Sequence, residues 1–143
     1  MSKIALLQAW YDDVWCAGNI DAIDRYMNAE TVATGIMSEM QMGRDEFRDL
    51  VSAMRTLVEE VNVSLPQWIE SGDWLAAIIS VTAVRVDTQA PIVCTGQVMV
   101  RFEDDKMVET YNQFDYLSLF EQLGQFPPET LAICMTGQRL SWT

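Results

Sequence analysis

The spacing of apolar residues changes once along the chain, near Asn62, and this change limits the fold more than any other feature of the sequence. Before Asn62, apolar residues recur at helical intervals; after it, they follow a period of two and are rich in β-branched and aromatic types. Helices therefore come first and strands second, in a chain of 143 residues that suits one domain. The sequence predicts a single α+β domain over residues 1–143.

The predicted elements follow from this periodicity and from turn residues. The helical part comprises a helix from about Ile4 to Gly18, a second to about Asn28, a strand over Thr31–Ile36 and a third helix from Gly43 to Val61. The remaining elements are four strands and a short helix, over Val63–Ser71, Trp74–Val86, Ile92–Phe102, Met107–Phe114 and Tyr116–Leu123.

The predicted strand Trp74–Val86 is apolar on both of its faces. Ile78 lies on one face and Ile79 on the other, whereas a strand with one wetted face would alternate apolar and polar residues. One face can pack on the helices. The other needs a second cover, and in so short a chain the expected cover is another copy, which predicts a homodimer through the outer face of the sheet.

The chain has no histidine, which removes many kinds of active site. Nucleophiles activated by histidine, histidine general bases and nearly all zinc or non-haem iron sites are excluded. Acid–base chemistry would need a carboxylate, tyrosine, lysine or cysteine. Cys16, Cys94 and Cys134 form no CxxC pair and are expected to be reduced. We expect no metal and no cofactor.

Acidic residues outnumber basic ones, 21 to 9, for a formal net charge of −12. So negative a surface repels nucleic acid and anionic membranes, which we exclude as partners. No apolar run reaches the ~20 residues that span a bilayer. The opening residues run directly into Asp12 and Asp13, which does not fit a signal peptide. The expected location is the cytoplasm.

Three segments resemble the SnoaL-like polyketide cyclases of the nuclear-transport-factor-2-like superfamily. They are a helix followed by Gly-Asn-Ile within Tyr11–Ile20, the Gly-Arg-acid-Phe start of a helix in Met42–Phe47, and KMVETYNQFDYLSLFEQLG over Lys106–Gly124. The resemblance covers about residues 3–126 and leaves a tail, 127–143. It implies a cone-shaped, curved antiparallel sheet packed on three N-terminal helices, the cystatin-like arrangement, around an apolar pocket.

The same resemblance implies positions for the site. The cyclases use an aspartate on the last strand as base, and by register this position is Asn112; their histidine helper corresponds to Val98. An amide cannot take up a proton, although it can donate a hydrogen bond to a carbonyl oxygen. The related ketosteroid isomerases have a phenolic donor that matches Tyr11.

Three residues are candidates for catalysis: Tyr11, Asn112 and Asp115. The candidate ligand-binding residues are Tyr11, Trp15, Met54, Val98, Thr110, Asn112 and Phe114. Each catalytic candidate has a structural alternative. Tyr11 could be a core aromatic bonded to a backbone carbonyl, Asn112 a structural tie, and Asp115 the N-terminal cap of the short helix after it.

Two functions therefore stay open. The first is a cyclase, isomerase or lyase acting next to a carbonyl of a small hydrophobic compound. The second is a binding or interaction module that keeps the pocket but has lost the family's aspartate and histidine. Fold alone does not choose between them, because this fold carries many chemistries.

Overall fold

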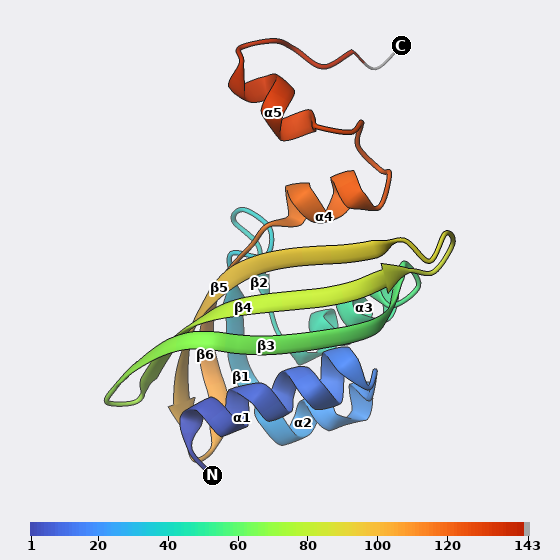
Figure 1. Cartoon of the computed structure of the whole chain (residues 1–143). Helices are drawn as coiled ribbons and strands as arrows, with labels where there is room; N and C mark the ends of the chain where they lie inside the picture. The colour runs from blue at the N-terminus through green and yellow to red at the C-terminus, as the bar shows by residue number, and fades with distance from the viewer. Residues whose placement is uncertain (142–143) are drawn as a thin grey trace.

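The computed structural model describes residues 1–141, in which a curved sheet encloses the N-terminal helices (Figure 1). The helical elements are α1 (Lys3–Trp10), a π-helical segment (Tyr11–Cys16), a 3-10 turn (Ile20–Ala22), α2 (Ile23–Tyr26), α3 (Arg44–Met54), α4 (Tyr116–Gln122) and α5 (Thr130–Met135). The strands are β1 (Met27–Thr34), β2 (Gln41–Met42), β3 (Val58–Ser71), β4 (Trp74–Arg85), β5 (Pro91–Glu103) and β6 (Lys106–Phe114). This is the α+β order predicted from the change of period.

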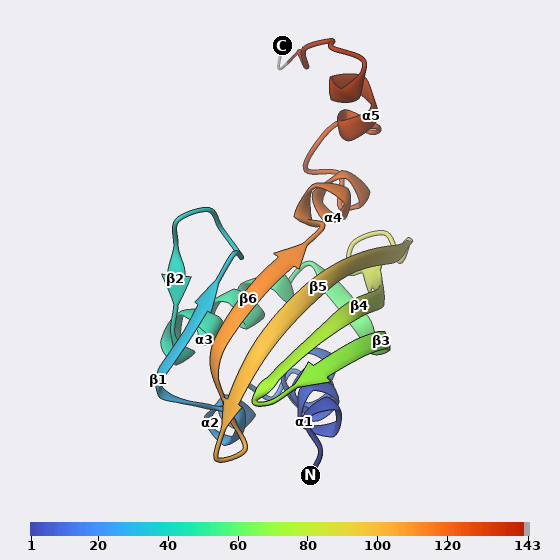
Figure 2. The ribbon, with the colours of Figure 1, turned by 90° about the vertical axis from the view of Figure 1, so that its left-hand side faces the viewer.

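The six strands form one sheet in the order β2-β1-β6-β5-β4-β3. Neighbours are antiparallel except β1 and β6, which run parallel, so the sheet is mixed where the sequence predicts an antiparallel one. A parallel pair needs a long connection, and β2, α3, β3, β4 and β5 all lie between these two strands in the chain. Figure 2 shows the sheet curving around α1, α2 and α3, while α4 and α5 lead away from its opposite end.

The first helix changes its winding halfway along. After α1, the segment Tyr11–Cys16 is π-helical, with the Ala17 amide donating to the Asp12 carbonyl oxygen at 2.9 Å. Helix formation ends at Gly18, which has a φ of 72°, as its residue type predicts. Short π-helical turns often occur at functional sites, and this one carries Tyr11 and Trp15.

Two helix ends lie earlier than predicted. The third helix stops at Met54, and Val58 and Val61 belong to β3, where Val58 pairs with Arg85. Valines fit either period in a short apolar run, and pairing with β4 decides in favour of the strand. Likewise, α2 ends at Tyr26 and β1 starts directly after it, so the strand predicted from Thr31 begins at Met27.

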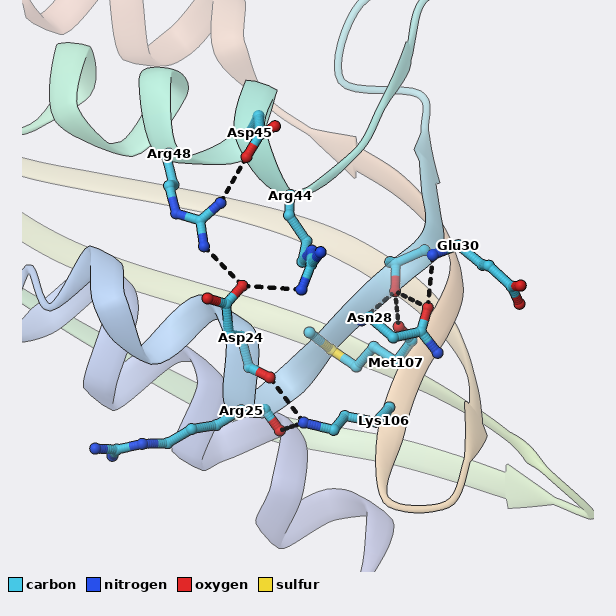
Figure 3. Close-up of polar contacts among 10 residues, drawn as sticks. Asp24, Arg25, Asn28, Glu30, Arg44, Asp45, Arg48, Lys106 and Met107 are labelled. Atoms are coloured by element: carbon cyan, nitrogen blue, oxygen red, sulfur yellow. Dashed lines mark hydrogen bonds and ion pairs between the residues drawn. The ribbon is translucent and has the colours of Figure 1, made fainter.

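A polar cluster ties α2, α3 and the start of β6 together (Figure 3). Asp24 accepts from Arg44 Nη1 at 3.1 Å and from Arg48 Nη2 at 2.6 Å, while Lys106 Nζ donates to the Asp24 carbonyl oxygen at 2.7 Å. The buried Thr31 hydroxyl donates to the Met107 carbonyl oxygen at 2.6 Å. These contacts fix β1 beside β6, which sets the positions of the inward-facing residues of β6.

The hydrophobic core has two parts. The larger part packs α1, the π-helical segment and α3 against the inner face of the sheet, and its most buried members include Leu7, Val14, Val51, Leu75 and Val100, each at most 1% exposed. The smaller part lies beneath α4 and contains Val58, Ala83, Ile92, Cys94, Leu119 and Leu123. The two parts border a common cavity, described below.

The outer face of the sheet carries apolar side chains as predicted. On β4, Leu75 and Ile79 are buried towards the helices, while Trp74 and Ile78 on the other face are half-buried. The Trp74 ring stacks on Tyr111 of β6, with centroids 6.2 Å apart. The face therefore offers a partly exposed apolar surface made by neighbouring strands.

The C-terminal tail continues beyond α4 as α5 (Figures 1 and 2). The Leu131 amide donates to Glu121 Oε1 at 2.8 Å, and Leu131 and Met135 are exposed. The last two residues of the predicted tail, 142 and 143, lie outside the described residues. Within residues 1–141, no helix has the length and apolar character to cross a membrane.

Candidate functional site

A cavity of about 130 Å³ lies between the helices and the inner face of the sheet. All seven residues predicted to bind a ligand line it: Tyr11, Trp15, Met54, Val98, Thr110, Asn112 and Phe114. The remaining wall is mostly aliphatic and aromatic. Its polar side chains are few, which is the usual composition of a small-molecule pocket.

Tyr11 is buried in the wall, with 9% of its surface exposed, and no hydrogen bond to its hydroxyl occurs within the described chain. Every fully enclosed side-chain oxygen or nitrogen of residues 1–141 does have a partner. The Tyr11 hydroxyl must therefore keep open space beside it, and that space is the cavity. The structure does not support the alternative in which Tyr11 bonds a backbone carbonyl. A buried tyrosine hydroxyl normally has a hydrogen-bond partner. Because this one has none within the described chain, it is available to bond a ligand.

Burial raises the pKa of Tyr11 well above its usual value, and the nearby Tyr116 raises it further because the two phenolate charges would repel. Tyr11 is thus a neutral phenol across the physiological range. It can donate a hydrogen bond, but it is not a base at neutral pH.

Tyr116 is a second phenol in the same wall, and sequence reasoning missed it. It is the first residue of α4, and its ring packs against Phe114 and Phe120 with centroid distances of 5.2 and 6.2 Å. Burial raises the pKa of its hydroxyl, which has no protein partner among residues 1–141. The sequence feature that could have identified Tyr116 is its position in the chain, just after the strand that carries Asn112.

Asn112 faces inward from β6, and its amide nitrogen is already engaged. Nδ2 donates to Thr110 Oγ1 at 2.9 Å and to the Thr34 carbonyl oxygen at 3.3 Å. Both amide hydrogens therefore bond to the protein in this structure, where the family resemblance predicts a donor to a ligand carbonyl. Asn112 is a structural tie that still reaches the cavity wall.

Asp115 lies outside the cavity wall and is exposed. Its carboxylate accepts from the Ser118 amide at 3.0 Å and so caps α4, the structural alternative foreseen from the sequence. The carboxylate that would have to act as base is therefore turned to solvent and bonded at the start of α4. Its contribution is to set the start of α4 and hence the place of Tyr116.

The other titratable groups of the wall do not supply a base either. Burial raises the pKa of the Cys94 thiol to about 11, so it is protonated at neutral pH. Arg55 donates through Nη1 to the carbonyl oxygens of Trp15 and Cys16, at 2.5 and 3.1 Å, and thereby caps the π-helical segment. No Asp or Glu of the described chain lines the cavity.

The site therefore has two phenolic donors and no ionised base. It can bind a neutral apolar molecule and polarise an oxygen of that molecule by hydrogen bonds in a medium of low dielectric constant. Removing a proton from carbon would need an acceptor from outside this wall.

Comparison with known families matches residues 7–110 to the SnoaL-like domain. Among solved structures, a candidate polyketide cyclase from Acidithiobacillus ferrooxidans superposes with a TM-score of 0.71 at 19% identity, covering 87% of this chain and 99% of its own. IdmH from Streptomyces antibioticus, also described as a candidate polyketide cyclase, gives 0.71 at 14% identity, with 86% and 99% covered.

A Catenulispora acidiphila protein with a ketosteroid isomerase-like fold, solved with trimethylamine, gives a TM-score of 0.72 at 15% identity, covering 89% of this chain and 100% of its own. These three structural matches cover both the helical half and the strand-rich half of the chain. At such identities they establish the fold alone. Among curated proteins, no significant sequence relative was found.

Proposed function

Because the chain belongs to the SnoaL-like domain family, we propose that its cavity binds a small hydrophobic compound through a carbonyl group. The observation that carries this proposal is the pair of phenols, Tyr11 and Tyr116, which face one apolar cavity without protein partners. A carbonyl oxygen has two lone pairs and can accept from both hydroxyls at once. An apolar ligand body would replace water along the remaining wall.

The size of the cavity limits the ligand. A cavity of about 130 Å³ is close to one that holds a single benzene ring. Met27, Met54 and Met107 in the wall can change rotamer and accommodate some variation in shape. A one-ring ketone is therefore the simplest probe of the site.

A second candidate function is catalysis at the carbon next to that carbonyl, as in a cyclase, isomerase or lyase. The family and its structural neighbours favour it, and two phenols would stabilise the negative charge that develops on the oxygen of an enolate. The wall contains no acid or histidine to take the proton, so we favour binding without turnover as the primary proposal.

Calorimetric titration with acetophenone tests the binding proposal. Tyr11→Phe and Tyr116→Phe should each weaken binding by about 1 kcal/mol, the contribution of one neutral hydrogen bond. Tyr111→Phe is the matched control, because it deletes a phenol from the exposed outer face. Equal affinity for all four proteins, or no binding by the wild type, would refute the proposal.

We also propose that the outer face of the sheet pairs with a second copy of the chain. Ile69, Met99 and Tyr111 are exposed on this face, 72%, 46% and 44% respectively. Arg101 offsets part of the acidic charge beside them, since it pairs with Glu109 at 3.0 Å and with Glu103 at 3.3 Å. Two such faces can meet with less repulsion than the net charge alone would give.

A further inference from the structure

The C-terminal segment 125–141, called the arm below, extends beyond the sheet instead of folding back on it (Figures 1 and 2). The first turn of α5 is anchored, since Thr130 is buried and the Leu131 amide donates to Glu121 Oε1 at 2.8 Å. The side chains of Leu131 and Met135 are nevertheless 47% and 79% exposed. A helix of six residues is not stable alone in water, so α5 needs an apolar surface beyond its own domain.

The link between α4 and α5 holds the arm in this extended position. Pro127 and Pro128 restrict the backbone, and the residue before a proline favours an extended conformation. Glu129, directly after them, has a φ of 60°, a left-handed conformation that few residues other than glycine adopt. The arm is therefore presented by a stiff link, which lowers the entropy lost when it binds a surface.

The outer face of the sheet contains a hollow of about 420 Å³, called the outer hollow below. Strands β3, β4, β5 and β6 all line it, and its members include Trp68, Ala76, Ile78 and Met99. Within residues 1–141, no charged side chain lines this hollow, although the chain has a net charge of −12. An uncharged hollow on an acidic protein suits an uncharged, apolar occupant.

The arm has the charge and the side chains of such an occupant. Its single acid, Glu129, is offset by its single base, Arg139, so the arm adds nothing to the net charge of −12. It can therefore approach an acidic second copy with less repulsion than any other surface of the chain would meet. Leu131, Ile133 and Met135 supply apolar side chains, and methionine adapts to irregular spaces.

We infer that the arm of one copy packs into the outer hollow of a second copy, whose own arm packs into the hollow of the first. Each copy has one arm and one outer hollow, so a two-fold axis fills both and leaves neither open. Without the arms, two outer faces would meet hollow against hollow and leave a gap that well-packed interfaces lack. This inference goes beyond the ligand proposed for the cavity and adds the arm to the proposed pairing of outer faces.

Sedimentation of the full-length protein over a dilution series tests the role of the arm. Leu131→Asp/Met135→Asp changes two side chains that are exposed in a single copy, so the fold and the circular dichroism spectrum should be retained. The dissociation constant of the dimer should rise by at least about tenfold, because two carboxylates would enter an apolar hollow. Met37→Asp is the matched control, since this 55% exposed methionine lies outside the arm and the outer hollow, and it should leave the constant unchanged.

Cysteine pairing between two distinguishable chains tests the place of contact. Cys134 is a free, exposed cysteine of the arm. A mass-tagged chain with Ala76→Cys in the outer hollow and Cys134→Ser in the arm is mixed with wild-type chain and oxidised with diamide. A disulfide should join the two chains between residues 76 and 134. The tagged chain with Cys134→Ser alone should form no such mixed dimer.

The outcomes separate the arm from the other proposals. An arm variant that dimerises as tightly as the wild type would overturn the inference and leave the pairing of outer faces standing. A monomeric wild type would overturn both, while acetophenone binding would still test the cavity on its own. Absence of the mixed disulfide would overturn the outer hollow as the place of contact. A disulfide within one chain, in Ala76→Cys with Cys134 retained, would mean that the arm binds its own copy and would also overturn the inference.

Discussion

Asn112→Asp puts a carboxyl group into a cavity wall that contains none, and its consequences can be worked out from its burial and one contact. The amide nitrogen of Asn112 faces the Thr34 carbonyl oxygen at 3.3 Å. A protonated carboxyl could replace that hydrogen bond, whereas an ionised one would place an anionic oxygen against a carbonyl oxygen. Burial and this contact should both raise the pKa of the introduced group above ~3.9, the value for an unfolded chain.

This shift predicts a pH-dependent loss of stability. Since the folded variant holds its proton to a higher pH than the unfolded chain does, the free energy of unfolding falls as pH rises from ~4 to the folded pKa and is level above it. A rise of about two pKa units corresponds to about 2.7 kcal/mol. Denaturant titrations of variant and wild type between pH 4 and 8 measure it, and parallel curves would contradict the argument.

The same carboxyl is the base that the cavity lacks. Incorporation of deuterium from solvent into the methyl group of acetophenone, followed by mass spectrometry, should be near background for the wild type. Asn112→Asp should raise it by about 10²–10⁴-fold once the carboxyl is ionised, the usual contribution of positioned proton transfer. Asn112→Leu is the control. Rapid exchange by the wild type that survives Asn112→Leu would refute the absence of a base and favour the enzymatic function.

Three further predictions concern assembly and packing. Light scattering at micromolar concentration should give twice the 16.2 kDa chain mass for the wild type and one chain mass for Ile78→Arg; a monomeric wild type would exclude the dimer. Leu75→Ala should lower the free energy of unfolding by about 2–5 kcal/mol because Leu75 is fully buried, whereas Ile69→Ala, at a side chain 72% exposed, should cost less than about 0.5 kcal/mol; equal losses would be inconsistent with the packing described. Gly18→Ala should destabilise the protein by more than about 1 kcal/mol, since the residue has a φ of 72° and a Cβ would lie 2.4 Å from Arg55 Nε; an unchanged melting temperature would argue against this helix end.

Periodicity was sufficient for most of the sheet. The strand predicted over Trp74–Val86 is β4, Trp74–Arg85, because a long apolar run is bounded by turns at both ends. Val58 and Val61 were assigned to a helix because a short apolar run suits both periods, and only pairing with β4 separates them. The parallel pairing of β1 and β6 likewise depends on a partner far along the chain.

For the site, the sequence predicts which residues meet but not how their hydrogen bonds are directed. The family register brings Tyr11, Val98 and Asn112 to one cavity, as the structure places them. That the Asn112 amide nitrogen is engaged depends on the Thr34 carbonyl, 78 residues away in the chain. Tyr116 escaped notice for a related reason, since only the packing of α4 brings it into the cavity wall.

The central claim is that two phenols of the cavity hold a carbonyl oxygen, and vibrational spectroscopy of a bound ketone tests it directly. In the wild type, the carbonyl stretch of bound acetophenone should move to lower frequency than in an apolar solvent, because donated hydrogen bonds weaken the C=O bond. The double variant Tyr11→Phe/Tyr116→Phe should return the band to the frequency found in that solvent while the ring still occupies the cavity. The same frequency in both proteins would contradict the account.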